Sequence, residues 1–546
     1  MLMIDYQHLP LILKFFAGLA VALGVGWSLG KLRPRTERID SLLILMAPPS
    51  LYVLGVKSAM AILLAPMADW SAGRLSPTYA LLRGFSLYYP ADSGPVYNTI
   101  YPPMSYLAHL PAALFHNPTW ALMAGALIGQ VLVLGPILAL CSAPHGDEGS
   151  TRGRLFSTFV FFGFWKYLAA GVLSTLFCHI HADAPSIGFG AMACVVLYAR
   201  RMAPTPSART LLSSAIFASM AVWSKQAMAP LFVVLPAWML LTAGPRAALR
   251  FSAWLGVSLA ALSAIFVGAF GWQAMKFNII DLPKSHPWMY APDYKHGFAT
   301  FLIELAGFAV PVVAGLVAVA YLARRRPEGT EADALPAGRW GATRADFRGN
   351  YWVLFAVLSA AFIPLGMLGR IKMGGHVNSY AHSLYFLGVA PCLVLLDWYA
   401  RNRERGRDRL NRTLKVLVLA WPLAPLLMVN TELLQYMAMY RPASENSQEV
   451  AYQYALKHPG EAYFPWNTLS TLMAEGQAYH FEAGIFDRDL GGFALSDTHF
   501  RRHLPAKLKV VAYPPDRVIE WSMKYLPEFK RRVAIPELPG WICYER

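Results

Sequence analysis

The stretch HIHADAP, residues 179–185, places two histidines and an aspartate between two long apolar runs of the chain. The run before it covers about 155–178 and the run after it about 184–199, and such runs are typical of helices in a hydrocarbon layer about 30 Å thick. A charged side chain at that position is costly, and proteins keep one there where it is needed. The stretch therefore predicts membrane helices and a polar site at their ends.

The composition of the whole chain supports this class of protein. The sequence has 546 residues, of which 56% are hydrophobic and 15% are charged, whereas soluble domains carry about 25% charged residues. The long apolar runs indicate helices rather than the short alternating strands of an outer-membrane barrel. The first run, 11–30, lacks a basic leader and a small-residue cleavage site, so we interpret it as a retained helix.

Twelve membrane spans are predicted from the apolar runs, with a soluble tail after the last one. The predicted spans are 11–30, 42–65, 119–142, 155–178, 184–199, 210–224, 227–243, 251–271, 298–322, 351–369, 379–399 and 416–430. Residues 1–430 then form a multi-pass domain with a large first loop at 66–118. Residues 431–546 form a small α/β domain, with a helix at 444–457 and a strand at 507–513.

Lysine and arginine are distributed unevenly between the alternate loops. One set of loops carries 24 of them and the other carries 8. Basic loops of membrane proteins face the cytoplasm, so the poorer set, the N-terminus and the tail are predicted to be extracytoplasmic. The net charge of +16 is explained by these loops and by membrane lipids, and it does not indicate a nucleic-acid partner. Five scattered cysteines without a CxxC spacing suggest neither a disulfide framework nor a zinc site.

The unusual polar residues fall on the predicted outer side. They come from separate segments, which suggests one site at the outer membrane surface. These residues are Asp69, His181, Asp183, Lys225, His286, Arg370, Lys372, His376 and Asn378.

Each of these residues also has a simpler interpretation. Charged residues at helix ends often serve as interfacial anchors. Asp183, followed by Ala-Pro, suits the N-cap of a helix, and capping does not exclude binding. Lys225 interrupts a long apolar stretch and needs a partner, for which a lipid phosphate is a natural candidate. The loop 66–118, rich in aromatic residues and proline, is expected to lie along the membrane interface.

Several of these motifs occur together in one known superfamily. They are an acid closing an early span, Leu-Leu-x-Gly with Leu-Tyr-Tyr, Tyr-Pro-Pro, His-Ala-Asp-Ala-Pro, a Lys-Gln hairpin, and Gly-Gly-x-x-Asn before a late span. In this order, over about residues 40–430, the chain resembles the GT-C integral-membrane glycosyltransferases. The most similar branches are the protein O-mannosyltransferase, aminoarabinose-transferase and rhizobial lipopolysaccharide-transferase-like enzymes.

The resemblance implies roles for individual residues. Asp69 matches the catalytic acid of the first loop, although its neighbour is Trp70 rather than a second acid, which leaves Asp183 as the candidate second carboxylate. Lys225 resembles the basic residues that hold the donor phosphate. The remaining residues expected to bind substrate are His181, Arg370, His376, Asn378, His286, Tyr88 and Tyr101.

The function implied is transfer of a sugar, with inversion, from a polyprenyl-phosphate donor to a lipid, glycan or protein acceptor at the outer face of the bacterial inner membrane. A carboxylate would act as general base, and Lys225 would stabilise the phosphate. No cofactor is indicated, and a divalent metal is left open. The alternatives are a transporter or flippase of lipid-linked saccharides, which usually has midplane charges and internal repeats, and an O-antigen-type ligase or polymerase.

Overall fold

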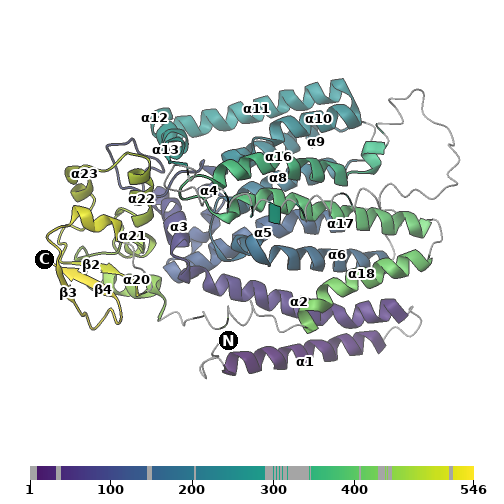
Figure 1. Ribbon diagram of the computed structural model, residues 1–546, viewed down its shortest axis with the longest axis horizontal. Coiled ribbons are helices and arrows are strands. Elements are labelled where there is room, and N and C mark those ends of the chain that lie inside the picture. The colour runs from purple at the N-terminus through teal and green to yellow at the C-terminus, as the bar shows by residue number, and fades with distance from the viewer. Residues whose placement is uncertain are drawn as a thin grey trace.

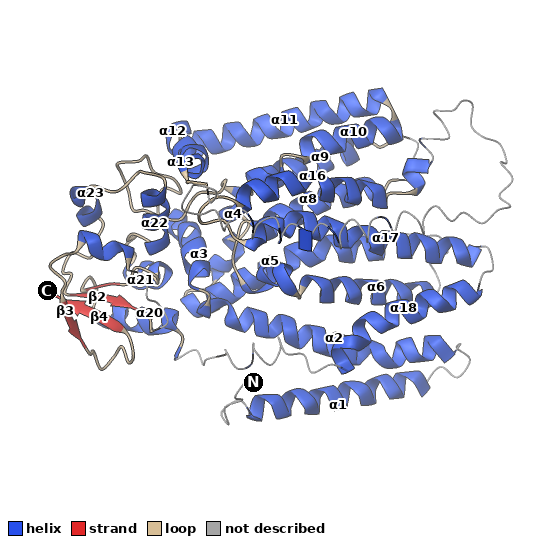
Figure 2. Ribbon diagram, in the orientation of Figure 1, coloured by secondary structure: helices blue, strands red, loops and turns tan. Residues whose placement is uncertain are grey.

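The computed structural model is a long bundle of helices with a small domain at one end (Figure 1). The residues that it describes are 9–31, 38–143, 151–201, 205–288, 346–404, 408–427, 445–515 and 520–546, with a few single positions between them. Within these ranges the fold is mostly helical, and its strands are confined to the tail (Figure 2). All five cysteines are free thiols.

The bundle consists of helices that agree closely with the predicted spans. They are α1 Leu9–Lys31, α2 Arg38–Leu64, α5 Pro118–Ser142, α6 Thr151–Leu168, α8 Asp183–Tyr198, α9 Ala208–Val222, α10 Leu231–Ala243, α11 Pro245–Phe270, α16 Trp352–Arg370, α17 Ala381–Glu404 and α18 Asp408–Leu427. Seven helical segments among the described residues are long and apolar enough to cross a membrane. The helices α8 and α9 are apolar but shorter, at 16 and 15 residues. The predicted span 298–322 lies outside the described residues.

The predicted span 155–178 is not one straight helix. The chain bends by 89° between α6 and the segment Gly171–Cys178, which contains the 3-10 turn η4 (Gly171–Ser174) and α7 (Thr175–Cys178). Gly171 has a φ of 56°, a conformation that residues with a Cβ adopt rarely. Hydropathy alone does not reveal such a bend, because both halves are apolar. The bend directs residues 179–182 toward the first loop.

The first loop folds into structure of its own. It contains η2 (Ala65–Met67), α3 (Asp69–Leu82), α4 (Met104–Leu107) and η3 (Leu110–Leu114). Residues 71–80 of α3 are all buried, and they pack against the α5 start and tail helix α21 (Thr468–Glu475) in one apolar cluster. We expect the loop to lie along the membrane interface, and in the structure the tail covers the α3 part of it.

The tail is an α/β domain, as its sequence predicts. The helix α20 (Ser447–Lys457) precedes a four-stranded sheet with strand order β1-β2-β4-β3. The strands are β1 Ala462–Tyr463, β2 Val510–Tyr513, β3 Arg531–Val533 and β4 Ile542–Glu545. Strand β2 pairs with β1 in parallel and with β4 in antiparallel fashion, in the register Val511 opposite Tyr544. The helix α22 (Glu482–Leu490) faces the first loop, where Phe481 N donates to Val96 O at 2.8 Å.

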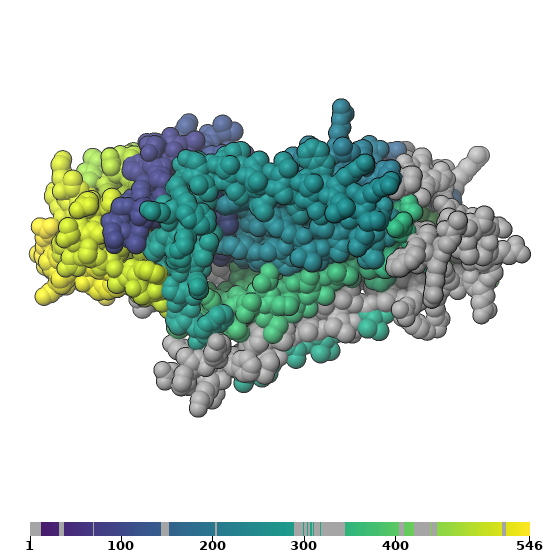
Figure 3. Space-filling view, turned by 90° about the horizontal axis from the view of Figure 1, so that it is seen from above, coloured from purple at the N-terminus to yellow at the C-terminus, as the bar shows by residue number. Residues whose placement is uncertain are grey.

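The loops with few basic residues gather at the end of the bundle that carries the tail. Figure 3 shows the tail in yellow at this end, with first-loop residues in purple and the segment that follows α11 in teal beside it. This segment consists of α12 (Trp272–Lys276), η6 (Phe277–Asp281) and α13 (Leu282–Ser285). The end of α1, the junction between α10 and α11, and the end of α17 lie at the opposite end (Figure 1). The shared end that the sequence predicts is therefore present.

Candidate active site

Asp183 is the centre of a polar cluster at this end of the bundle. Its side chain is buried, with 1% exposed, and it is the first residue of α8. The N-cap of α8 is Ala182, and no side chain caps the helix, so the interpretation of Asp183 as an N-cap is wrong. The carboxylate faces other segments instead, because a buried charge needs charged or hydrogen-bonding partners.

Four side chains from three segments surround this carboxylate. Lys225, in the turn after α9, forms an ion pair with Oδ1, and His181 Nδ1 lies 2.6 Å from Oδ2. Asn378, in the 3-10 turn η8 (Val377–Tyr380), donates to Oδ2 at 2.8 Å. His382 of α17 lies 3.6 Å from Oδ1. The structure thus brings together Asp183, His181, Lys225 and Asn378 of the predicted site, and it adds His382.

Tyr101 connects this cluster to the first loop. Its hydroxyl lies 3.2 Å from His181 Nε2, and its backbone carbonyl accepts the hydroxyl of Tyr88 at 2.6 Å. A neutral imidazole donates from one nitrogen and accepts at the other, so His181 can donate to Asp183 and accept from Tyr101. Tyr88 therefore positions Tyr101 rather than facing the cluster itself.

Arg74 of α3 is a site residue that the sequence did not single out. Its guanidinium lies 4.7 Å from the centre of the Tyr101 ring, and Lys225 Nζ lies 5.4 Å from the same centre. Arg74 is 8% exposed and donates to Asn98 O at 3.1 Å, while its Nε has no hydrogen-bond partner. Two cations thus converge on one aromatic ring, and the protein satisfies Arg74 only in part. The available signal was a lone arginine in the apolar run of α3.

The electrostatics of the cluster are strongly positive around one fixed anion. Burial is the main cause that lowers the pKa of His181 to about 4, and the cations Arg74 and Lys225 act in the same direction. The Asp183 carboxylate acts to raise this pKa but does not outweigh them. Burial also opposes the charged form of Lys225, but the Asp183 carboxylate outweighs it and raises the pKa of Lys225. At neutral pH the Asp183 carboxylate is therefore surrounded by the neutral imidazole of His181, the charged ammonium of Lys225 and the guanidinium of Arg74.

Asp69 begins α3, directly after the turn η2. Two residues later, Ser71 Oγ accepts a hydrogen bond from Ile180 N at 3.2 Å, which ties the start of α3 to the HIHADAP stretch. Trp70, the residue after Asp69, packs edge-to-face on Trp466 of the tail, with ring centres 5.9 Å apart. The backbone of Asp69 therefore lies beside the segment that carries His181 and Asp183.

The other predicted residues occupy the rim of this end. Arg370 ends α16 and donates to Gly375 O at 3.3 Å, and His376 occupies the N-cap position of η8. Lys372 donates to Pro283 O at 2.6 Å. His286 Nε2 lies 3.1 Å from the backbone carbonyl of Asp487 in α22. His286 thus belongs to the contact with the tail rather than to the Asp183 cluster.

The tail contributes a second residue that the sequence did not single out. Asn98 Nδ2 donates to the carboxylate of Asp487. The backbone carbonyl of Asn98 accepts a hydrogen bond from Arg74 Nη1. Burial raises the pKa of Asp487 to about 7, against the charge of Arg74. A chain of contacts therefore runs from the tail through Asn98 and Arg74 to Tyr101. No group of three or more metal-ligating side chains is arranged for a metal ion among the residues that the structure describes.

Comparisons with known proteins identify the fold. No protein-family model matches the sequence, and no curated protein matches it. ArnT from Cupriavidus metallidurans bound to undecaprenyl phosphate superposes with a TM-score of 0.53 at 12% identity, covering 91% of this chain and 97% of ArnT. The same ArnT in its apo state gives a TM-score of 0.44 at 13% identity, covering 87% and 93%. The oligosaccharyltransferase of Archaeoglobus fulgidus in complex with Zn and sulfate gives 0.42 at 12% identity, covering 85% and 68%. The chain therefore shares the multi-pass fold of ArnT, which is the fold that its motifs predict.

Proposed function

We propose that this protein is a glycosyltransferase that moves a sugar from a polyprenyl-phosphate donor to an acceptor nucleophile. The observation that carries the proposal is the pair of cations, Arg74 and Lys225, which lie 4.7 and 5.4 Å from the centre of the Tyr101 ring. A phosphate is bound best by several charged donors at once, and Arg74 has an unused buried N–H. The fold supports the same conclusion, since ArnT carries undecaprenyl phosphate.

The two carboxylates have different tasks in this proposal. The buried carboxylate of Asp183 already accepts hydrogen bonds from Lys225, His181 and Asn378. Its oxygens are therefore not free to take a proton from the acceptor. Its role is to hold the ammonium and the imidazole in place. Asp69, at the start of α3 beside this cluster, is the general base that removes the acceptor proton. Arg74 and Lys225 stabilise the charge that develops on the leaving phosphate.

The reaction is a single displacement at the anomeric carbon, so it inverts the configuration there. The acceptor oxygen or nitrogen forms the new bond, its proton goes to Asp69, and the lipid phosphate leaves with the bonding electrons. The site lies at the end with few basic loops, which supports the outer face of the inner membrane. Reporters fused after Arg405 should then score cytoplasmic, and those after Asn446 extracytoplasmic.

Donor binding tests the proposal directly. The affinity of the purified chain for undecaprenyl phosphate is measured for the wild type, Arg74→Ala and Lys225→Arg, with Lys276→Ala as the matched control. Lys276 is an exposed cation at the same end, paired with Asp281. Arg74→Ala should weaken binding by about tenfold to a hundredfold, because a charged hydrogen bond is lost.

The remaining variants separate charge from geometry. Lys225→Arg should weaken binding less than Arg74→Ala does, since the charge beside Asp183 is kept. Lys276→Ala should bind like the wild type. Equal affinity of the wild type and Arg74→Ala would remove the phosphate from this site and overturn the proposal.

A further inference from the structure

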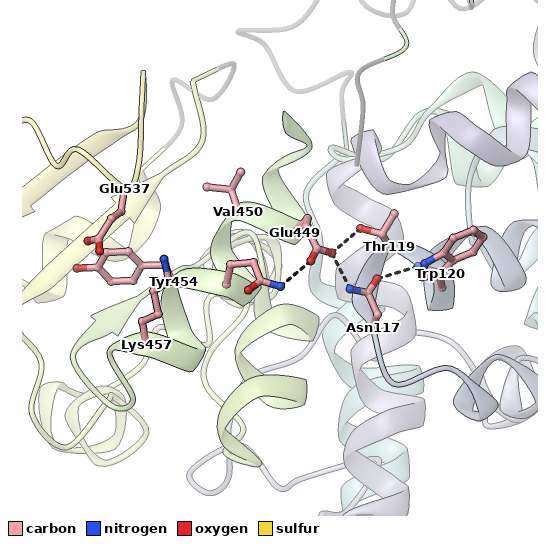
Figure 4. A pocket seen from close by; sticks show the side chains of 9 residues that line it. Asn117, Thr119, Trp120, Glu449, Val450, Tyr454, Lys457 and Glu537 are labelled. Carbon is pink, nitrogen blue, oxygen red and sulfur yellow. Dashed lines mark hydrogen bonds between the residues drawn. The ribbon is translucent and has the colours of Figure 1, made fainter. Parts of the chain in front are cut away.

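The tail meets the rest of the protein at two joints. At the first joint, Glu449 of α20 accepts hydrogen bonds from Asn117 and Thr119 at the start of α5, at 2.7 and 3.1 Å (Figure 4). At the second joint, α22 and its neighbours hold residues 94–98 of the first loop. The two joints use different elements of the tail, so one can change while the other keeps the tail in place.

The second joint is built around His480, whose side chain is fully buried. Its Nδ1 accepts the backbone N–H of Val96 at 2.9 Å, and its Nε2 lies 3.1 Å from the backbone carbonyl of Phe500. A neutral imidazole supplies one acceptor and one donor, which is what these two partners require. A protonated ring would point a second N–H at the N–H of Val96. The contact therefore requires the neutral ring.

Two further histidines surround this ring. His499 of α23 (Asp497–Arg502) has its Nε2 2.8 Å from the backbone carbonyl of Gly94, and His503 follows the same helix. The three ring centres are 5.4, 5.7 and 5.8 Å apart. We call His480, His499 and His503 the histidine cluster. Positive charges so close together repel one another strongly where little water separates them, so this joint favours neutral rings.

The surroundings also oppose a charge on the histidine cluster. Burial is the main cause that lowers the pKa of His480 well below its usual value, and His503, His499 and Arg488 act in the same direction. Burial lowers the pKa of His503 too, with help from His499 and Arg502. Among the described residues, no ion pair joins the cluster to a carboxylate.

The carboxylates of the neighbouring elements have other partners. Those of α22 are bound as follows: Glu482 by Ser522 N, Asp487 by Asn98 and Asp489 by Lys524. The other charged side chains on the elements that pack here are Asp92 of the first loop, Arg74 of α3, Glu475 of α21, and Asp497, Arg501 and Arg502 of α23. The Asp92 charge acts on Arg488, and Glu475 accepts Tyr479.

The segment that the histidine cluster holds leads directly to the cations of the candidate site. The backbone carbonyl of Asn98 accepts Arg74 Nη1 at 3.1 Å and the hydroxyl of Tyr106 at 3.0 Å. Tyr101, whose ring lies beside Arg74, follows three positions later. If residues 94–98 move, the acceptor that orients Arg74 moves with them.

We propose that the histidine cluster makes the tail an acid-sensitive clamp on the donor site. While the three rings are neutral, they hold residues 94–98, and thereby Arg74 and the Tyr101 ring, in place. In acid the rings gain protons and the segment is released, while the first joint keeps the tail attached. The loss of phosphate binding that follows rests on the proposed function, whereas the release itself needs no ligand.

The direction of the pH dependence follows from the released state. A released histidine takes up a proton near pH 6.5, and the clamped His480 does not. Each such histidine therefore weakens the clamp by up to about tenfold per pH unit below 6.5. Asp487 acts in the opposite direction, because burial raises its pKa to about 7. The pKa of Glu482 is also raised to about 7, but its partner Ser522 belongs to the tail, so release leaves it unchanged.

Hydrogen exchange of the full chain in detergent tests the release. The protection of the backbone amides of residues 94–98, relative to their intrinsic exchange rates, is measured between pH 7.5 and pH 5.5. His480→Asn offers Val96 an oxygen acceptor that does not titrate. The wild type should lose about tenfold of its protection relative to this variant. His499→Gln, which keeps a donor toward Gly94, should also lose less than the wild type, and Asp487→Asn should lose more.

His458→Asn is the matched control, since His458 pairs with Glu537 at the first joint, at 3.2 Å. It should lose protection like the wild type. Gly484→Ala should lower the protection already at pH 7.5, because a Cβ there would lie 2.7 Å from the backbone oxygen of Tyr97. Equal pH dependence in the wild type, His480→Asn and His499→Gln would overturn the inference, as would unchanged protection in Gly484→Ala.

The affinity for undecaprenyl phosphate, measured at the same pH values, tests the consequence. Protonation of the phosphate itself is common to all variants and cancels in their comparison. The affinity of the wild type should fall relative to that of His480→Asn, in parallel with the protection. Release of the segment without loss of affinity would contradict the phosphate site at Arg74 and leave the clamp intact, so the two proposals fail separately.

Discussion

Asp183 and Asp40 lie at opposite ends of the helical bundle, and each is 1% exposed and paired with a lysine. Around Asp40, Lys415 Nζ lies at 2.6 Å and Arg152 Nε at 3.2 Å, so α2, α18 and α6 are joined by ionic contacts. Around Asp183 the partners are one lysine, two histidines and an asparagine. A buried ion pair alone is therefore no sign of a functional site.

The difference between the two clusters lies in what surrounds the charges. The Asp40 cluster joins three long helices, with Asp40 in the first turn of α2, Arg152 in the first turn of α6 and Lys415 within α18. Asp183 is bound by residues at helix ends and in short turns, next to a loop that presents Tyr101 and Arg74. Groups of mixed charge and an incompletely bonded guanidinium are typical of a ligand site. The first cluster joins helices, and the second is the one that we propose for substrate binding.

The largest effect that separates the two ends is expected at Asp69. Asp69→Asn keeps the size of the side chain but removes its ability to accept a proton, so turnover should fall by about 10²–10⁴-fold. Affinity for undecaprenyl phosphate should change little, because the phosphate contacts are elsewhere. Turnover and affinity are measured on the same preparation. Wild-type turnover in this variant would exclude Asp69 as the base.

A matched pair of variants compares the clusters themselves. Asp183→Asn and Asp40→Asn each leave a buried cation without its counter-charge, which costs about 3–5 kcal/mol of unfolding free energy. Both should therefore lower the temperature of thermal unfolding. Only Asp183→Asn should also weaken undecaprenyl phosphate binding, because it releases Lys225. A loss of binding in the Asp40 variant of equal size would erase the distinction between the two ends.

Asp487 is a third buried aspartate, and it accepts a hydrogen bond from the amide of Asn98 instead of pairing with an ammonium. Its contribution to stability should therefore depend on pH. Burial raises its pKa to about 7, so the folded protein binds this proton more tightly than the unfolded chain does. The stability that it contributes is fully present below pH 4, where the unfolded chain is protonated too, and it is lost as pH rises from about 4 to about 7, by at most about 1.4 kcal/mol per pH unit. Asp487→Asn should remove this dependence.

The measurement for Asp487 is the difference in thermal unfolding between the wild type and Asp487→Asn from pH 4 to pH 8. Other titrating groups, such as Glu482 in the same helix, are present in both proteins and cancel in the difference. The stability of the variant relative to the wild type should increase from pH 4 to about pH 7 and then stay constant. A difference that does not change between pH 4 and pH 7 would show that folding does not raise the pKa of Asp487.

The smallest effect is expected at Tyr101. Tyr101→Phe removes the hydroxyl that faces His181 and keeps the ring that lies next to Arg74 and Lys225. The loss of one hydrogen bond is worth about 1 kcal/mol, so donor affinity should fall only about fivefold. Tyr101→Leu also removes the aromatic face and should cost more. Identical affinities of the Phe and Leu variants would mean that the ring has no part in holding the cations.

The sequence by itself determined the class of protein and the common end of its polar residues. Apolar runs fix which segments are helices, and the bias in basic loops groups the alternate connections, because both patterns are local along the chain. For that reason Asp183, His181, Lys225 and Asn378 could be predicted to share a site. The strand and helix signals of the tail are local in the same sense.

Only the tertiary structure decided which of these residues touch and which others join them. Within the chain, Lys225 pairs with Asp183, 42 positions away, and the sequence does not specify this contact. Arg74 joins the site because α3, on which the tail packs, places it next to the Tyr101 ring. Asp487 joins it because α22 brings this carboxylate to Asn98. The bend after α6 directs HIHADAP toward the first loop. Such contacts depend on how distant segments pack, and hydropathy carries no record of the partner that each segment meets.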